Sequence, residues 1–424
     1  MSVAGLVPPV KTLVLSVDIG AGHRMAAEAL CQGIAAERPG SEHKLVEALE
    51  HTGPDGGALA KEMYFGALED APDLWGAVYA QRGLFEVFRP LNEIADDFRL
   101  GKLAPLARAF APDVVLAMHP TACGLASALA RNRDVTCPVV AVLTDFDAHP
   151  AWVYQGIDHY LVASESMERA MRGHLPSGDV TTTGLPIRLA FEHVGDAASI
   201  KARLGLAPDR TTLLLLGGGL GLGPIAETAE ALARLGGNLQ LVVIAGRNKD
   251  LERSARAVAE RATIPVHVTG LVENIWDYMC VADLAIGKPG GMTCAELLAC
   301  GVPLVALAPI PGQEQANSDV LVDLRVALHA PTADAATRVV RELLSRPNAL
   351  AAMRRAARAL GRPSAARDAA RVVLGLVDAR RPKVRVRIAD GAPPQQPATP
   401  ARPSTTRDPI GDELRALKKK LGIG

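Results

Sequence analysis

Short apolar runs alternate with stretches of helical periodicity along most of the chain. In the first half the apolar runs lie at residues 12–18, 113–119, 138–147 and 159–165. In the second half they lie at 211–216, 239–245, 267–272, 285–287 and 302–308. Buried strands that alternate with helices are typical of parallel, doubly wound sheets. The predicted fold class is therefore α/β, with ligands collecting at the carboxyl ends of the strands.

The chain length of 424 residues predicts two domains and an appendage. Gly184-Leu185-Pro186-Ile187 and the polar stretch to about residue 200 look like the crossing between domains. We predict a first domain over 1–190, a second over 191–380 and a tail over 381–424. The tail is rich in Pro, Ala, Thr and Arg, and eleven Lys/Arg and five Asp/Glu residues follow Leu376. It reads as a disordered tether with a short terminal helix, either solvated or in contact with an anionic membrane or partner.

Helical periodicity without strand signals extends over about residues 58–111, and aromatic side chains cluster there although the protein is only 4% aromatic. One interpretation is an extra helical layer packed on the sheet. The other is an apolar acceptor cleft or a membrane-surface face, with Arg82 and Arg89 near anionic headgroups. The aromatic residues are Tyr64, Phe65, Trp75, Tyr79, Phe85, Phe88 and Phe98.

Charge and cysteine content exclude several classes. Lys+Arg and Asp+Glu both total 46, so no chain-wide basic footprint for nucleic acid is present. No apolar run reaches the roughly 18 residues of a membrane span, and Met1–Val10 lacks the pattern of a signal peptide. None of the six cysteines forms a C-x-x-C pair, which predicts reduced thiols of a cytoplasmic protein rather than zinc ligands or disulfides.

Residues 285–317 carry the most concentrated candidate chemistry. Gly290 and Gly291 precede a predicted helix, whose N-terminus would attract a phosphate. Glu296 lies about one turn into that helix, where it can accept hydrogen bonds from a diol such as a ribose. A polar triplet, Gln313, Glu314 and Asn317, opens the next helix. Together these features predict a nucleotide-sugar pocket, although a Gly-Gly turn alone is often only a tight connection. Lys288 either neutralises phosphate or caps a strand.

A second glycine-rich turn follows the strand at 211–216. It contains Gly219, Gly221 and Gly223, and it predicts a phosphate cradle of backbone amides. The next strand ends in Gly246-Arg247-Asn248, with no acidic residue to bind a nicotinamide ribose, so a dehydrogenase is disfavoured. The segment around Gly270 could present backbone to a flat base.

Polar residues also follow the strands of the first half. His23 lies after two glycines at a helix start, where the helix dipole favours the neutral imidazole that a general base requires. His119, Asp145, Asp147 and His149 lie at other strand ends. The D-x-D spacing permits a divalent metal, but we expect instead that one aspartate orients a base or acceptor and the other caps a turn.

Four segments resemble a known family. They are GAGHRMAAEAL, VLTDFDAHPAWVYQGIDHYLVASE with TGLPI, GGGLGLGPI, and KPGGMTCAELLACGVPLVALAPIPGQEQAN. Over about residues 11–378 the chain resembles a GT-B glycosyltransferase of family 28, near the synthases of monogalactosyl- and glucosyl-diacylglycerol. The resemblance implies two Rossmann-like domains facing a cleft. It also implies transfer of a hexosyl group from a UDP-sugar to a lipid acceptor, with inversion and with no metal or other cofactor. The enzyme would act at the inner face of the cytoplasmic membrane.

The resemblance also implies roles for individual residues. His23 would be the base, assisted by Asp145; Glu296 would bind the donor ribose; and Gln313, Glu314 and Asn317 would hold the sugar and phosphates. The donor-binding candidates are Gly219, Gly221, Gly223, Gly246, Gly270, Lys288, Gly290, Gly291, Thr293, Glu296, Gln313, Glu314 and Asn317. The acceptor-binding candidates are Gly22, His119, Asp147, His149 and Trp152.

Three alternatives stay open. A UDP-N-acetylglucosamine 2-epimerase shares this fold and a UDP-sugar pocket, but it needs no acceptor surface. A non-catalytic sensor of sugar nucleotides or lipid surfaces would bind the donor without turnover. A glycosyltransferase with a non-lipid acceptor would keep the chemistry and change only the acceptor.

Overall fold

The computed structural model describes residues 8–17, 21–51, 72–83, 100–175, 178–219, 221 and 223–380, except for the side chains of 72–75. The predicted aromatic cluster lies largely outside these residues, as do Arg89 and the tail at 381–424. Within the described part, no helix combines the length and the apolar character needed to cross a membrane.

The first lobe is built on a six-stranded parallel sheet with the order β2-β1-β3-β4-β5-β6. Strands β3, β4 and β5 are buried along their whole length, as is β1 beyond its first residue, because helices cover both faces of the sheet. The strands are β1 (Lys11–Ser16), β2 (Glu42–Glu47), β3 (Val114–Ala117), β4 (Val139–Val142), β5 (His159–Val162) and β6 (Asp179–Thr182). The helical segments are α1 (Gly22–Glu37), η1 (Ala48–His51), α3 (Pro72–Ala80), α5 (Leu103–Phe110), α6 (Pro120–Arg131), η2 (Pro150–Trp152) and α7 (Glu165–Arg172).

The second lobe repeats the architecture with a six-stranded parallel sheet in the order β12-β11-β10-β7-β8-β9. The strands are β7 (Thr211–Leu216), β8 (Leu239–Ile244), β9 (Val266–Thr269), β10 (Leu284–Gly287), β11 (Leu304–Leu307) and β12 (Ala327–Ala330). The helical segments are η3 (Leu189–His193), α8 (Ala197–Arg203), α9 (Ile225–Ala233), α10 (Lys249–Ala259), α11 (Ile275–Cys280), α12 (Gly291–Ala299), α13 (Gln313–Asp323), α14 (Ala333–Leu344), α15 (Pro347–Leu360) and α16 (Ala365–Arg380). The predicted fold class, two Rossmann-like doubly wound lobes, is confirmed.

Each sheet has a point where the strand order reverses, and ligands of doubly wound sheets bind there. In the first lobe the reversal lies between β1 and β3, which are followed by His23 and His119. In the second lobe it lies between β7 and β10, which are followed by the 217–223 glycine turn and by Gly290 and Gly291. The topology therefore places the predicted chemistry of both lobes at their reversal points.

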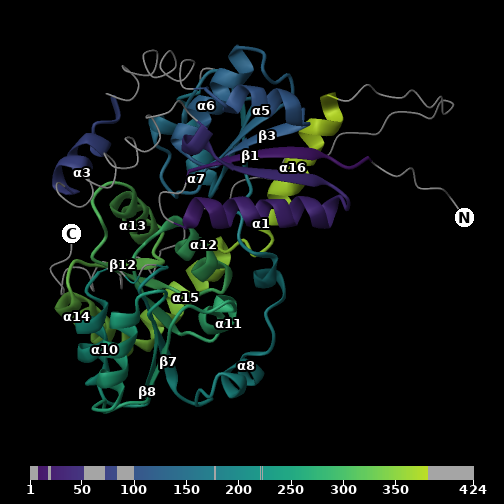
Figure 1. Cartoon of the computed structure of the whole chain (residues 1–424). Coiled ribbons are helices and arrows are strands. Elements are labelled where there is room, and N and C mark those ends of the chain that lie inside the picture. Colours follow the sequence, from purple (N-terminus) through teal and green to yellow (C-terminus); the bar gives the residue numbers. More distant parts are fainter. Residues whose placement is uncertain are drawn as a thin grey trace, which may run out of the picture.

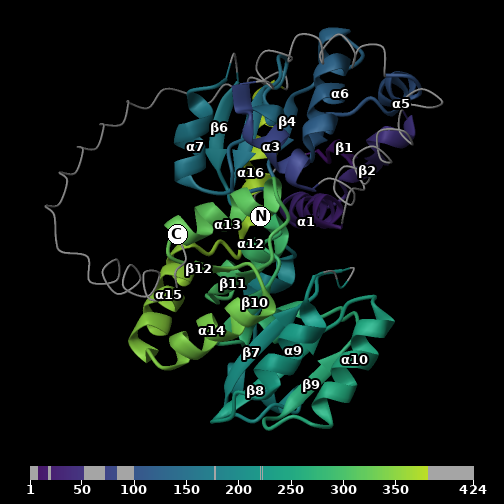
Figure 2. The same ribbon diagram turned by 90° about the vertical axis from the view of Figure 1, so that its left-hand side faces the viewer.

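The last described helix, α16, returns from the second half of the chain to the first lobe, where it crosses α1 and packs against it (Figure 1). A Cβ at Gly33 of α1 would lie 2.4 Å from the carbonyl oxygen of Ala366, so glycine is required for this close approach. Arg38 donates two hydrogen bonds to Asp378, of 2.9 and 2.6 Å. Figure 2, turned by 90° from Figure 1, again shows α16 in the first lobe. The residues that we assigned to the second domain thus include a helix that packs on the first lobe.

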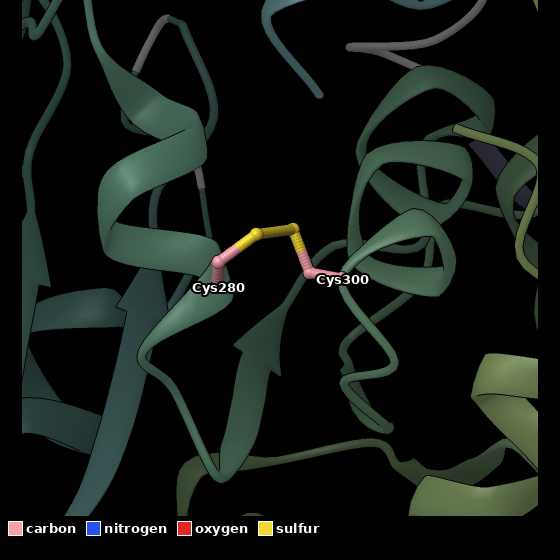
Figure 3. Close-up of a disulfide and its surroundings, with 2 residues drawn as sticks. All are labelled: Cys280 and Cys300. Atoms are coloured by element: carbon pink, nitrogen blue, oxygen red, sulfur yellow. A yellow bond between two sulfur atoms is a disulfide. The ribbon is translucent and has the colours of Figure 1, made fainter. Parts of the chain in front are cut away.

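The prediction of six reduced thiols is wrong for one pair. Cys280 at the end of α11 and Cys300 just after α12 form a disulfide with a Cα–Cα distance of 4.8 Å (Figure 3). They are separated by 20 residues and lie in no recognisable motif, so only the packing of the two helix ends brings them together. Cys31, Cys123, Cys137 and Cys294 are free thiols, and all but Cys137 are buried.

Candidate active site

His23 is the second residue of α1 and faces the first-lobe strand ends. Its Nδ1 and the hydroxyl oxygen of Thr144, just after β4, are hydrogen-bonded at 2.8 Å. Burial lowers the pKa of His23 to about 4, against the opposing effect of a hydrogen bond to the Met118 backbone. The imidazole is therefore neutral at physiological pH, as predicted, but burial rather than the helix dipole is the main cause.

His119 lies beside His23, with ring centroids 4.8 Å apart and the rings at 89°. It precedes α6, and its Nδ1 accepts a hydrogen bond of 3.1 Å from the backbone N–H of Thr121. Burial, and to a lesser degree His23, hold the pKa of His119 well below its usual range. The structure thus brings together two neutral imidazoles, one of which is a helix cap.

Asp145 connects the two lobes. Its carboxylate accepts hydrogen bonds from Gln313 Nε2 at 3.1 Å and from Asn317 Nδ2 at 3.4 Å, both on α13 of the second lobe. The backbone N–H of Phe146 donates in return to Asn317 Oδ1 at 2.8 Å. Burial raises the pKa of Asp145 to about 6, and the amide hydrogen bonds oppose the shift. One predicted catalytic residue and two predicted sugar-binding residues therefore contact each other directly.

Backbone contacts close the same junction. A Cβ at Gly291, the first residue of α12, would lie 2.0 Å from the carbonyl oxygen of Thr144. A Cβ at Gly22, the first residue of α1, would lie 3.5 Å from Met292 Cγ. The N-termini of α1 and α12 thus meet at the strand end that carries Thr144, and glycine at 291 permits the approach.

Asp147 and His149 contact α3 and the residues that follow it, whereas the Trp152 side chain hydrogen-bonds Asp145. Arg82 Nη2 donates to both carboxylate oxygens of Asp147 at 2.6 Å. His149 Nε2 donates to the carbonyl of Tyr79 at 2.9 Å, and the two rings stack with centroids 4.0 Å apart. His149 and Trp152 are each only 1% exposed. Asp147 and His149 thus hold α3 and Arg82 in place, and the acceptor-binding role of all three residues stays a prediction.

The glycine turn of the second lobe rests on the loop after β8. A Cβ at Gly246 would lie 2.4 Å from the carbonyl oxygen of Gly218, and one at Gly221 would lie 2.6 Å from Asn248 Cβ. Gly218 and Gly219 are exposed at the end of β7. The neighbouring Gly270 is close to Glu252, whose Oε2 would lie 2.9 Å from a Cβ there. The loop after β8 therefore packs against the glycine turn, while Gly218 and Gly219 stay exposed.

Lys288 and Glu314 form a half-buried pair beside this turn. Lys288 Nζ lies 3.8 Å from Glu314 Oε2, and Lys288 Cε would lie 3.6 Å from a Cβ at Gly223. Glu314 also accepts a hydrogen bond of 2.9 Å from the backbone N–H of Ile310. Burial raises the pKa of Glu314, and Lys288 opposes the shift. Lys288 thus places a side-chain cation beside the glycine turn, and its role at a phosphate stays a prediction.

Glu296 is 3% exposed, and its Oε1 lies 3.4 Å from Nη2 of Arg188. Burial raises the pKa of Glu296 to about 7, although Arg188 opposes the shift. Arg188 also donates to the carbonyl of Glu273 at 3.1 Å and lies over the Trp276 ring, 5.1 Å from its centroid. Its Nε is buried and has no hydrogen-bond partner. The predicted ribose-binding acid is therefore held by an arginine from the interdomain crossing. Thr293 lies in the same helix and is half-buried.

Sequence reasoning missed Arg188 and Thr144, and it placed Arg82 near lipid headgroups rather than on Asp147. Arg188 directly follows the Gly184–Ile187 segment, which was interpreted only as the crossing between domains, and its partner Glu296 lies 108 positions away in the sequence. Thr144 lies directly before Asp145 at the same strand end, so its position was the available signal, but its contact with His23 joins positions 121 residues apart in the sequence.

The D-x-D pair does not present two free carboxylates. Asp147 accepts hydrogen bonds from Arg82, and Asp145 accepts hydrogen bonds from Gln313 and Asn317 of α13. Among the residues that the structure describes, no group of three or more His, Cys, Asp or Glu side chains is arranged to hold a metal ion. Cationic and dipolar groups in this region include Lys288, Arg188 and the N-termini of α1 and α12.

Known families match both lobes. The monogalactosyldiacylglycerol (MGDG) synthase family matches residues 23–187, and the glycosyltransferase family 28 C-terminal domain matches residues 212–370. The chain therefore combines an MGDG synthase domain in its first lobe with a glycosyltransferase family 28 C-terminal domain in its second. A processive diacylglycerol beta-glucosyltransferase of Bacillus mycoides (strain KBAB4) is 29% identical over 312 residues, which cover 73% of this chain and 79% of the relative. The predicted enzyme class, a UDP-sugar-dependent family 28 glycosyltransferase, is confirmed.

Solved structures share the fold. MurG of Acinetobacter baumannii matches with a TM-score of 0.56 and 16% identity, covering 87% of this chain and all of MurG (100%). A UDP-N-acetylglucosamine 2-epimerase matches with a TM-score of 0.51 and 11% identity, covering 85% of this chain and 94% of its own. At these identities the likeness concerns the fold alone, whereas both family matches are to glycosyltransferase or glycolipid synthase domains.

Proposed function

We propose that this family 28 enzyme transfers a hexosyl group from a UDP-sugar to a diacylglycerol-type lipid, with inversion and without a metal, at the inner face of the cytoplasmic membrane. The observation that carries the proposal is the meeting of the two reversal points. His23 of the first lobe is joined through Thr144 to Gly291, the N-terminus of α12 in the second. An acceptor base and a phosphate-binding helix end therefore face the same place.

In the proposed reaction the lipid hydroxyl loses its proton to the neutral His23 imidazole as its oxygen attacks the anomeric carbon. The bond from that carbon to the UDP oxygen breaks, and the electron pair leaves with UDP. Attack opposite the leaving group inverts the configuration. A pKa of about 4 keeps the His23 imidazole unprotonated at neutral pH, as a base requires, but it also makes the ring a weaker base than one with a pKa near 7.

Charge developing on the departing diphosphate is met by fixed groups of the second lobe. The N-terminus of α12 at Gly290 and Gly291, the exposed turn at Gly219 and the Lys288 ammonium supply donors and positive potential. Asp145 and Asp147 already accept hydrogen bonds from other side chains. In the proposal, the charge of the diphosphate is therefore neutralised by the α12 N-terminus, the glycine turn and Lys288, and not by a metal ion.

The remaining donor contacts follow from the polar residues of α12 and α13. Glu296, when ionised, accepts hydrogen bonds from the ribose hydroxyls, with Arg188 balancing its charge. Gln313, Glu314 and Asn317 bind the sugar and phosphates. The printed name of the Bacillus relative supports a diacylglycerol acceptor. On the acceptor side, α3 lies over the strand ends, with Val78 40% exposed, and we assign it to the lipid surface.

The test is UDP release by the purified enzyme with UDP-glucose, UDP-galactose or UDP-N-acetylglucosamine, with and without vesicles that contain diacylglycerol. We expect release that depends on the lipid and persists in EDTA, and a glycolipid product of inverted configuration. His23→Ala should reduce turnover at least about 100-fold and leave UDP affinity unchanged. An isomerised donor formed without lipid would instead identify an epimerase, and full activity of His23→Ala would remove this residue as the base.

A further inference from the structure

Thr144 is the first polar residue after the buried run of β4, and its side chain and main chain face different partners. Its hydroxyl oxygen lies 2.8 Å from His23 Nδ1. Its carbonyl oxygen lies against Gly291, at the start of α12. The residue is 4% exposed, so its hydroxyl has little access to solvent and the contact with His23 is not in competition with bulk water.

We infer that Thr144 is a positioning residue for transfer: its hydroxyl fixes the ring orientation and tautomer of His23. The inference rests on the proposed function of His23 as the base. A base that uses Nε2 must carry its remaining proton on Nδ1, and a hydroxyl oxygen at hydrogen-bonding distance from Nδ1 accepts that proton's hydrogen bond. The Nε2 lone pair is then left for the lipid hydroxyl.

The chemistry of threonine suits this task. Its β-branched side chain has few accessible χ1 rotamers, so a buried threonine offers its hydroxyl from a nearly fixed point. His23, by contrast, stands in the first turn of α1. The His119 ring lies edge-on to it at a centroid distance of 4.8 Å, and the Met118 backbone also hydrogen-bonds the His23 ring, so the contacts with Thr144 and Met118 together bear on the tautomer.

The chain offers a matched control. His159 Nε2 and Thr181 Oγ1 form a second histidine–threonine hydrogen bond, also of 2.8 Å, between β5 and β6. His159 is buried as well, at 6% exposure. Thr181→Val therefore removes the same kind of bond at a place with no assigned role in transfer.

The experiment compares wild type with Thr144→Val, which keeps the shape and removes the hydroxyl, and with Thr144→Ser, which restores it. We expect kcat of Thr144→Val to fall about tenfold, the loss expected for one hydrogen bond, with KM for the UDP-sugar within about twofold of wild type. Thr144→Ser should recover most of kcat. Thr181→Val should keep the wild-type kcat.

A second measurement does not depend on turnover. In protein labelled with ¹⁵N-histidine, the His23 ring signals are identified by their loss in His23→Gln, and their shifts report the tautomer. We expect mainly Nδ1–H in wild type and a changed population in Thr144→Val. Unchanged ring shifts, or a Thr144→Val kcat equal to that of wild type, would overturn the inference. A wild-type protein that transfers no sugar but shows the tautomer change would overturn the proposed function and keep only the structural part of the inference, that Thr144 sets the His23 tautomer.

Discussion

Replacing Glu296 by Gln should weaken the pH dependence of folding stability. Burial raises the pKa of Glu296 from 4.5 to about 7. Between these pH values the native protein keeps a proton that the unfolded chain has released, so wild-type stability falls as the pH rises through this window and levels off above about pH 7. Glutamine carries no titrating proton, so the variant lacks this contribution.

The magnitude follows from the pKa shift. Within the window, the free energy of unfolding of the wild type falls by about 1.4 kcal/mol for each pH unit. Glu296 is partly ionised near pH 7 in the native protein and near pH 4.5 in the unfolded chain, so the total loss between pH 5 and pH 8 is about 2.5 kcal/mol. For a domain of the size of the second lobe this is about 5–10 °C in Tm. The Tm of Glu296→Gln minus that of wild type should therefore increase by this amount between pH 5 and pH 8.

Thermal unfolding followed by circular dichroism at pH 5, 6, 7 and 8 makes the measurement. Asp145, whose pKa burial also raises, titrates in both proteins and cancels in the difference. Glu230→Gln, at an exposed residue of α9 paired with Arg234, controls for the loss of a carboxylate as such. A Tm difference between Glu296→Gln and wild type that is the same at pH 5 and pH 8 would refute the reasoning.

Two further predictions concern the packing around α12. Gly291→Ala places a Cβ 2.0 Å from the Thr144 carbonyl oxygen, so it should lower the free energy of unfolding by about 1–3 kcal/mol and reduce transfer. Gly290→Ala is the control: its Cβ meets nothing within 4 Å, so this variant should keep the wild-type Tm. The Cys280–Cys300 disulfide closes a loop of 20 residues, so its reduction should lower the free energy of unfolding by about 3 kcal/mol. The measurement is the Tm with and without dithiothreitol. A Tm that does not respond to dithiothreitol, or that responds equally in Cys280→Ser, contradicts this prediction.

The sequence predicted the features that depend on local pattern. Central strands of a parallel sheet are buried on both faces, so β1, β3, β4, β7 and β8 read as apolar runs. Residues that directly follow such strands must meet at one edge of the sheet. This is why His23 and His119, far apart in the sequence, were both predicted at the site and lie with their rings 4.8 Å apart.

Features that depend on how the lobes pack had no local signal. The edge strand β2 is only partly buried, so its residues do not form an apolar run and it was missed. The pairs Asp145–Gln313 and Arg188–Glu296 join residues 168 and 108 positions apart, and each requires the observed orientation of the lobes. The return of α16 to α1 and the Cys280–Cys300 disulfide depend on packing in the same way.

The contacts of Asp145 bear on how the proposed donor would enter. Gln313 and Asn317, assigned to the sugar, already donate to the Asp145 carboxylate, and Phe146 bonds back to Asn317. A sugar hydroxyl that takes either amide must replace a hydrogen bond to a buried carboxyl, each worth about 1.5–3 kcal/mol to a charged group. Because that carboxyl has a pKa of about 6, it is ionised at neutral pH and cannot be left unpaired. The proposed donor contacts therefore predict that donor binding is coupled to the contact between the lobes, with Asp145 as the group that both share.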